Sequence, residues 1–170
     1  MKMDQDKLLE SLLTAADSAK SASPIVKLLK QGADVQGTDS FGLTPLMRAA
    51  LFNSRAEVIK ALVDGGADIT AREPQYKSTA LQLAANHNPS PKVIEALVEA
   101  GSDIHEVNYL GESALIMAVN SGNDTRVISA LIRAGSDINA RDYQDRSALD
   151  YARMSRRSYV VKILKAAGAR

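Results

Sequence analysis

Few side chains in this sequence have the types and spacing that metal binding or catalysis requires. The chain holds two histidines, His87 and His105, and no cysteine among its 170 residues. A zinc site needs several ligands that converge on one point, and covalent catalysis needs a nucleophile beside a base. Neither pattern can be recognised around the two histidines. We therefore expect no catalytic centre, no metal site and no cofactor.

Four aspartates recur at regular places and resemble a row of carboxylates: Asp34, Asp68, Asp103 and Asp137. Each follows a glycine and a small residue, a setting in which an aspartate usually accepts hydrogen bonds from nearby backbone. The segment GESALIMAVNSG has two glycines but lacks the lysine of a phosphate-binding loop. These patterns indicate turns, and the sequence predicts a protein that is not an enzyme.

Charge is distributed unevenly along the chain, although its sum is close to zero. The formal net charge is +1, but residues 141–170 hold eight Lys and Arg against three Asp. The first residues, MKMDQDKLLE, contain acids where a signal peptide has an apolar run. No stretch approaches the ~18 consecutive apolar residues of a membrane-spanning helix. We expect a soluble, cytoplasmic protein with no membrane contact.

The glycines that follow each apolar stretch recur at a nearly constant distance. Gly32, Gly66, Gly101, Gly135 and Gly168 are separated by 34, 35, 34 and 33 residues. A constant period of this size is typical of stacked supersecondary units, each too small to bury its apolar face alone. The sequence therefore predicts a solenoid of repeated units.

Each unit carries the same order of local signals, seen most clearly in residues 39–71. The turn DSFG is followed by Thr44 and Pro45, which suit the N-cap and the first position of a helix. A second helix then has an apolar stripe that recurs in three units: Val58, Ile59, Leu62 and Val63; Val93, Ile94, Leu97 and Val98; Val127, Ile128, Leu131 and Ile132. Each unit is thus predicted to be a turn, a helix, a turn and a second helix.

Three residues mark the expected end of the first helix in successive units: Asn53, Asn88 and Gly122. Asparagine and glycine tolerate the left-handed backbone conformation better than other residues do. We therefore expect all three to end their helices in that conformation.

These motifs resemble the ankyrin repeat family, whose pattern runs D-x-x-G-x-T-P-L-H-x-A-A and then a helix ending in L-L-x-x-G-A-D-V-N-A. The resemblance covers residues 5 to 170. It implies an all-α solenoid of helix-turn-helix units joined by β-hairpin-like loops. A single domain, 1–170, would comprise a capping unit (5–38), full repeats (39–71, 72–106 and 107–140) and a C-terminal capping repeat (141–170). An extra residue between the helices of the full repeats resembles bacterial members.

Two departures from the family pattern carry expectations of their own. The family's histidine is replaced by Met47, Gln82, Ile116 and Asp150, so we expect its hydrogen bond to the turn to be absent. The hairpin REPQYKST is longer by one residue, contains Pro74 and lacks the turn glycine, so we expect an irregular tip. Arg153 and Lys165 replace apolar residues in the last unit, so we expect this unit to act as a cap with a polar outer face.

The resemblance also implies a surface for a partner, because the family's partners usually contact hairpin tips and exposed positions of the first helices. Carried over position by position, this surface comprises Phe41, Leu43, Leu51, Phe52, Tyr76, His87, Tyr109, Leu110, Tyr143, Arg146 and Met154. Four aromatic residues fall at tips, and aromatic side chains are enriched at interfaces. The alternative is that the tip aromatics pack against adjacent hairpins. Tyr151 and Tyr159 are expected to be packing residues within the last unit.

The predicted function is that of a monomeric protein-binding module, acting as a scaffold or an inhibitor. The alternative is a nucleic-acid or phosphate ligand bound by the basic C-terminal unit, through Arg153, Arg156, Arg157 and Lys162. No interleaved aromatic residues or nucleic-acid motif support that alternative. A solvated outer face explains the basic residues equally well, and the sequence predicts another protein as the partner.

Overall fold

The protein is a row of helix pairs with a loop rising from each junction. A computed structural model describes residues 4–170, and this range contains ten α-helices and no extended strand. The helices are α1 (Gln5–Ser18), α2 (Ser23–Lys30), α3 (Pro45–Phe52), α4 (Ala56–Asp64), α5 (Ala80–His87), α6 (Pro91–Glu99), α7 (Ala114–Asn120), α8 (Thr125–Arg133), α9 (Ala148–Met154) and α10 (Ser158–Ala166). The all-α solenoid is therefore confirmed.

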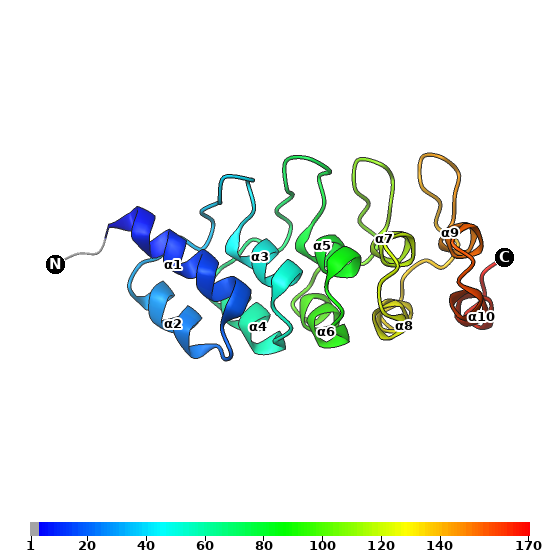
Figure 1. Cartoon of the computed structure of the whole chain (residues 1–170). Coiled ribbons are helices and arrows are strands. Elements are labelled where there is room, and N and C mark those ends of the chain that lie inside the picture. Colours follow the sequence, from blue (N-terminus) through cyan, green and yellow to red (C-terminus); the bar gives the residue numbers. More distant parts are fainter. Residues whose placement is uncertain (1–3) are drawn as a thin grey trace.

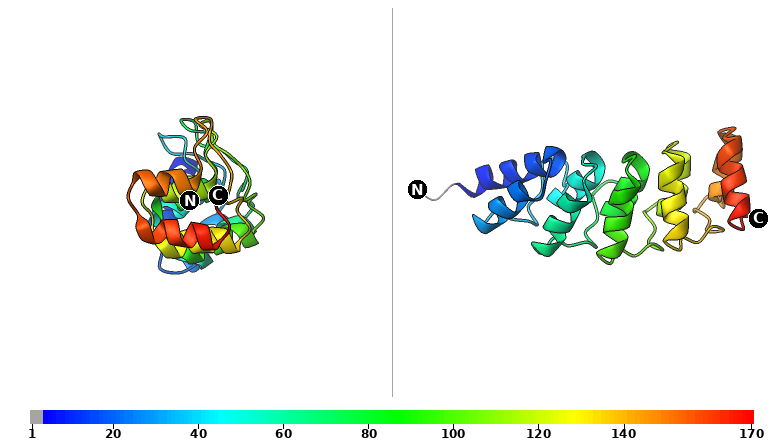
Figure 2. Two further views of the ribbon diagram at one scale, coloured as in Figure 1. Left: turned by 90° about the vertical axis from the view of Figure 1, so that its right-hand side faces the viewer. Right: turned by 90° about the horizontal axis from the view of Figure 1, so that it is seen from below.

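The helices stand in two rows, with the odd-numbered helices next to the hairpin loops and the even-numbered helices farther away (Figure 1). Neighbours within each row pack side by side, from α1 to α9 in one row and from α2 to α8 in the other. The hairpins gather on one side of the molecule when it is viewed along its length (Figure 2). Within residues 4–170 no helix is long and apolar enough to cross a membrane.

The predicted apolar stripes form the core between the two rows. The first three members of each stripe are buried, and Leu97 in the central unit has no exposed surface. The fourth members, Val63, Val98 and Ile132, are half-buried and pack against the same core. Because the stripes recur in phase, successive units bury one another along the whole row.

Hydroxyl side chains begin the first helices, as the sequence predicts. Thr44 accepts a hydrogen bond from the backbone N–H of Met47, and Thr79 accepts one from Gln82. The expected loss of the family's link to the turn is wrong at Gln82. Its amide Nε2 donates to the carbonyl of Glu106 (2.9 Å), the last residue of its own repeat, and to that of Glu112 (3.2 Å) in the next hairpin. An amide can replace the histidine because it keeps a donor at the end of a side chain of similar reach.

The prediction of left-handed helix ends at Asn53 and Asn88 is wrong. Both residues have extended backbone, with φ of −101° and −91°. Only Gly122 has a positive φ, of 82°. The structure places Asn123, and not Gly122, in the position equivalent to the two asparagines, because Asn123 makes the same contacts. Asn123, one residue after Gly122, is therefore the equivalent of Asn53 and Asn88 in this unit.

These asparagines link each unit to the preceding one through buried hydrogen bonds. The amide Nδ2 of Asn88 donates to the carbonyls of Ala50 and Asn53, each at 2.9 Å. Asn53 and Asn123 bond in the same way to the units before them. In the last unit the guanidinium of Arg157 takes this place and donates to the carbonyl of Asn123 at 2.7 Å. We call Asn53, Asn88, Asn123 and Arg157 the asparagine ladder.

The hairpin at residues 73–78 is closed by a different set of residues from its neighbours. Lys77 adopts a positive φ of 57°, the role that Gly42 has in the preceding hairpin. The carboxylate of Glu73 accepts hydrogen bonds from the backbone N–H groups of Gln75, Tyr76 and Ser78. A longer acidic side chain therefore accommodates the extra residue that the sequence predicted to distort the tip.

Candidate functional site

A side-chain acceptor fixes the shape of each hairpin tip. The Oδ1 atom of Asp39 accepts hydrogen bonds from the backbone N–H groups of Phe41 (2.8 Å) and Leu43 (3.0 Å). Asn108 and Asp142 use their Oδ1 atoms in the same way in the last two hairpins. Side chains at the tips are consequently presented on a backbone that is already ordered.

The last three hairpins are also joined to one another at their tips. The backbone N–H of Tyr109 donates to the carbonyl of Tyr76 at 2.9 Å, and that of Tyr143 donates to Leu110 at 3.0 Å. The rings of Tyr76 and Tyr109 have centroids 5.6 Å apart with an interplanar angle of 30°. Tyr143 lies against Gly111, where an added Cβ would be 2.6 Å from its ring. The tips thus form one continuous edge.

Four of the predicted residues lie on this edge, and Phe41 lies on the preceding tip, whose Gly42 packs against Pro74. We call the five residues the hairpin-tip row: Phe41, Tyr76, Tyr109, Leu110 and Tyr143. Phe41 and Tyr143 are 76% and 75% exposed, whereas Tyr76, Tyr109 and Leu110 are between 38% and 52% exposed. Packing between hairpins therefore accounts for part of the Tyr76 and Tyr109 surface. Most of the ring surface of Phe41 and Tyr143 remains open to solvent.

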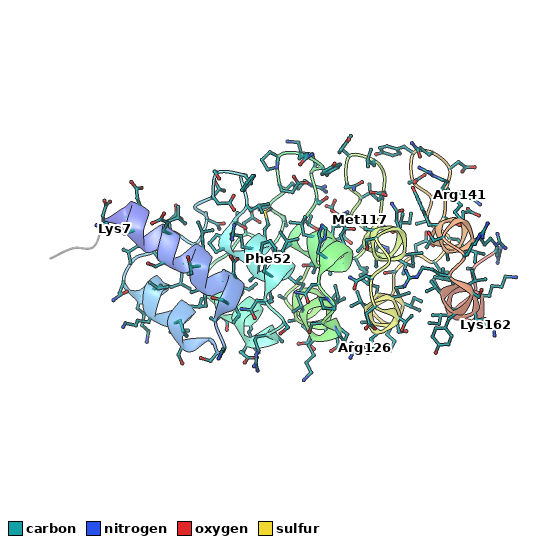
Figure 3. The ribbon with its side chains drawn as sticks, in the orientation of Figure 1. Lys7, Phe52, Met117, Arg126, Arg141 and Lys162 are labelled. Atoms are coloured by element: carbon teal, nitrogen blue, oxygen red, sulfur yellow. The ribbon has the colours of Figure 1, made fainter. Side chains whose placement is uncertain are left out.

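Phe52 lies at the C-terminal end of α3, where it is 59% exposed (Figure 3). The guanidinium carbon of Arg48 is 5.4 Å from the centroid of the Phe52 ring. Arg48 also donates to Asp39 at 2.7 Å and forms an ion pair with Asp17. The hydrogen bonds that Arg48 donates to Asp17 and then to Asp39 raise its pKa, although burial opposes this shift. The ring of Phe52 therefore rests on a fixed cation.

The other predicted residues of the first helices lie in different surroundings. Leu51 and Leu43 are half-buried, and Leu43 packs against the core. His87 is exposed, and its Nε2 lies 2.9 Å from the amide nitrogen of Asn86. Met154 is 64% exposed at the end of α9. His87 and Met154 are the last residues of α5 and α9, whereas the tips precede these helices, so the predicted residues lie at both ends of the first helices.

Arg146 is held within the last unit and is not a free surface residue. Its Nε lies 3.6 Å from Oδ2 of Asp142, and its guanidinium carbon is 4.8 Å from the centroid of the Tyr151 ring. The hydroxyl of Tyr151 donates to Oδ2 of Asp142 at 2.6 Å. Burial, together with that hydrogen bond, raises the pKa of Tyr151 to about 12.

The prediction that Tyr151 is a packing residue is confirmed, because this side chain is buried. The same prediction is wrong for Tyr159, which is 67% exposed on α10.

Sequence reasoning missed a cleft of about 390 Å³ between the last two hairpins. It is lined by Tyr109, Leu110, Glu112, Asn120, Asp142, Tyr143, Gln144, Arg146 and Tyr151. Glu112 was not among the predicted site residues, although it occupies the same tip position as Leu43 and Arg146, which were selected. Its burial depends on the neighbouring hairpin, which no local pattern reveals.

The basic residues of the last unit do not form one free patch. Arg157 belongs to the asparagine ladder and also donates to the carbonyl of Val119 at 3.2 Å. Arg153 lies 3.6 Å from a carboxylate oxygen of Asp150. Arg156 and Lys162 are exposed, and Lys162 projects from α10 at the end of the molecule (Figure 3). Half of the proposed basic site therefore has partners within the protein.

Metal-binding clusters of His, Asp or Glu are not found among the residues that the structure describes.

Comparison with known proteins identifies the family of this chain. The family model for ankyrin repeats, in three copies, matches residues 12–108 and 87–170. No curated protein matches the chain. The helix pairs, the hairpins and these matches agree across nearly the whole sequence, and the chain belongs to the ankyrin repeat family.

Proposed function

We propose that this protein is a non-enzymatic binding module that recognises another protein through the hairpin-tip row and the exposed side chains of the first helices. One observation carries the proposal: large aromatic side chains are exposed on tips whose backbone is held by hydrogen bonds to side-chain acceptors. Aromatic residues dominate the binding energy of many protein interfaces. Exposing large aromatic side chains to water is unfavourable, so their regular placement at the tips supports a role in binding.

The proposed mechanism is rigid recognition. The hydrogen bonds of Asp39, Asn108 and Asp142 fix the tips before a partner arrives. A surface that is already ordered loses little conformational entropy on binding, so a larger share of the contact energy appears as affinity. A monomer in the cytoplasm could use this surface as a scaffold or as an inhibitor that covers a partner's active site.

The alternative partner, a nucleic acid or another phosphate ligand, has less support. Two of its four basic residues, Arg153 and Arg157, already contact groups within the protein. Phosphate-driven binding depends on several free cations and weakens steeply as salt concentration rises. We therefore favour a protein as the partner over a nucleic acid or another phosphate ligand.

A comparison of three forms of the protein tests the proposal. Each is used as bait in a lysate of the source organism, and captured molecules are identified by mass spectrometry. The forms are the wild type, a Phe52→Ala/Tyr109→Ala variant and an Arg153→Ala/Arg156→Ala/Lys162→Ala variant. Arg157 is left unchanged, since its loss would leave the carbonyls of Val119 and Asn123 without a donor. Thermal unfolding of all three confirms that the baits are folded.

We expect a protein that the wild type and the basic-residue variant capture and the aromatic variant does not. Loss of capture with the basic-residue variant alone, or recovery of nucleic acid, would contradict the proposal and favour the phosphate ligand.

A further inference from the structure

The cleft between the last two hairpins contains a buried carboxylate whose charge is not matched. Glu112 is only 8% exposed and contributes to the lining of this cleft. Its Oε2 accepts a hydrogen bond from Nδ2 of Asn108 at 3.0 Å, and its Oε1 accepts one from Nδ2 of Asn120 at 3.2 Å. Both donors are neutral amides. A carboxylate offers about four acceptor sites, so roughly two remain for a ligand.

The other buried carboxylates show what a fully satisfied acid looks like in this protein. Glu73 accepts three hydrogen bonds from the backbone of its own tip. Asp142 accepts two from its tip and a third from Tyr151, and Arg146 forms an ion pair with it. The carboxylate of Glu112, by contrast, accepts no hydrogen bond from a backbone N–H and forms no ion pair with any cation in residues 4–170. Buried charges are normally paired, so this one calls for an external cation.

The charges that line the cleft lead to the same conclusion. Glu112 and Asp142 are acidic, Arg146 is basic, and no other lining residue carries a full charge. Arg146 is already used by Asp142 and by the ring of Tyr151. One negative charge is left over, and it belongs to Glu112. Charge complementarity therefore favours a ligand with one positive charge.

The aromatic residues around the cleft suit the same ligand. Tyr109 and Tyr143 line it, and both present exposed ring surface. A cation is attracted to the face of an aromatic ring within about 6 Å of the centroid. The volume, about 390 Å³, lies near the lower end of the range of roughly 300–1,000 Å³ for small-ligand sites. It can hold one long side chain, while the rest of a partner lies over the tips.

We propose that this cleft receives a single lysine or arginine side chain of the partner protein, whose cationic group pairs with the carboxylate of Glu112 between Tyr109 and Tyr143. The inference rests on the proposed function and specifies the chemistry of its partner: the bound segment presents a basic residue at the last two hairpins. Leu110 and the ring of Tyr143 then contact the apolar stem of that side chain.

Short peptides test the cleft without knowledge of the partner. Acetyl-Gly-Lys-Gly-amide and acetyl-Gly-Arg-Gly-amide are titrated into ¹⁵N-labelled protein, and backbone amide shifts are followed by NMR. The matched neutral probe contains norleucine, which has a similar stem and no charge. A glutamate peptide tests the opposite choice, an anion bound by Arg146. We expect saturable shifts at Leu110, Glu112 and Gln144 with a basic peptide and none with the norleucine or glutamate peptide.

Two variants and a control locate the contact. Glu112→Gln keeps the size of the side chain and removes its charge, so we expect affinity for the basic peptide to fall about tenfold or more. Tyr143→Ala alters only an exposed ring, so it keeps the test valid if the first variant does not fold, and we expect it to weaken binding severalfold. Glu99→Gln, at the exposed end of α6, removes one acid elsewhere and should leave the affinity unchanged.

The inference is overturned if neither basic peptide gives saturable shifts, if norleucine binds equally well, or if both cleft variants bind like the wild type. Stronger binding of the glutamate peptide would also overturn it and would assign the cleft to Arg146. These failures are separate from failure of the proposed function. A partner captured equally by the wild type and by Glu112→Gln would refute the cation cleft and leave the binding module intact.

Discussion

The asparagine ladder and the hairpin-tip row both join neighbouring units at a regular interval, yet they place opposite kinds of side chain in opposite surroundings. The ladder is polar and shielded from solvent: Asn53 and Asn88 are only 4% and 1% exposed, and Asn123 and Arg157 are half-buried. The tip row is apolar and open, with Phe41 and Tyr143 more than 70% exposed. If burial depended on hydrophobicity alone, the aromatic rings would be buried and the asparagines would be exposed.

The hydrogen bonds of the asparagine side chains explain why they can be buried. Each asparagine donates to two carbonyls of the preceding unit, so burial costs it no hydrogen bond. The rings of Phe41 and Tyr143 cover little of the protein's own surface. The ladder is therefore expected to contribute to stability and the tip row to binding. The following predictions separate these two contributions.

The largest effect is expected in the core beneath the ladder. Leu97 has no exposed surface and lies on the apolar stripe of the central unit. Leu97→Ala removes buried methyl groups and leaves a cavity, so we expect the free energy of unfolding to fall by about 2–5 kcal/mol. Urea denaturation followed by circular dichroism measures this change. A loss below ~0.5 kcal/mol would mean that the stripe does not carry the packing described here.

The next effect concerns the ladder itself. Asn88→Ala leaves the carbonyls of Ala50 and Asn53 buried without this donor. We expect a loss of about 1–3 kcal/mol in the free energy of unfolding, the usual cost of unsatisfied buried groups. Asn86→Ala is the matched control, because the Asn86 amide contacts only the exposed His87 ring. Equal effects of the two substitutions would contradict a special role for the ladder.

A smaller effect is expected at the last hairpin, with a dependence on pH. Burial and the bond to Asp142 raise the pKa of Tyr151 from 10.0 to about 12. A raised pKa means that the folded state holds the proton more tightly, so the stabilisation is complete below pH 10 and is lost between pH 10 and 12. Tyr151→Phe should cost about 1–2 kcal/mol at pH 8.

Urea denaturation of wild type and Tyr151→Phe at pH 8 and near pH 11.5 checks this expectation. The difference between the two proteins should narrow at the higher pH, because only the wild type has a phenol to ionise. A difference that stays constant would show that folding does not raise the pKa of Tyr151.

The smallest effect on stability is expected in the tip row. Tyr143→Ala removes a ring that is 75% exposed, so we expect the free energy of unfolding to change by less than about 0.5 kcal/mol. Capture of the partner should nevertheless decrease. A large loss of stability in the same denaturation assay would assign the ring to packing on Gly111 and remove it from the binding surface.

The sequence allowed the fold to be predicted because the signals of this fold are local and repeated. Glycine spacing, the threonine N-cap and the apolar stripes each depend on residues within one unit. The ladder was missed because each asparagine bonds to carbonyls more than 30 positions earlier, and an asparagine after a helix looks like a local helix end. Only the folded structure shows which carbonyls each asparagine amide can reach.

The candidate site was predictable in part for the same reason. The places of Phe41, Tyr109 and Tyr143 at the tips follow from turn chemistry, which the sequence displays. The burial of Glu112 and the exposure of Tyr159 depend on how a neighbouring unit is oriented. That orientation results from packing along the whole row, so no single stretch of sequence encodes it.

Site-specific photo-crosslinking tests the central claim most directly, because the chain supplies a matched pair of positions. Tyr143 at the tips and Tyr159 on α10 are 75% and 67% exposed, and each is replaced in turn by p-benzoyl-phenylalanine. Irradiation in the source lysate is followed by mass spectrometry of the adducts. We predict a partner-protein adduct from position 143 that is absent from position 159. An adduct from position 159 alone, or equal adducts from both, would contradict a binding surface on the hairpin tips.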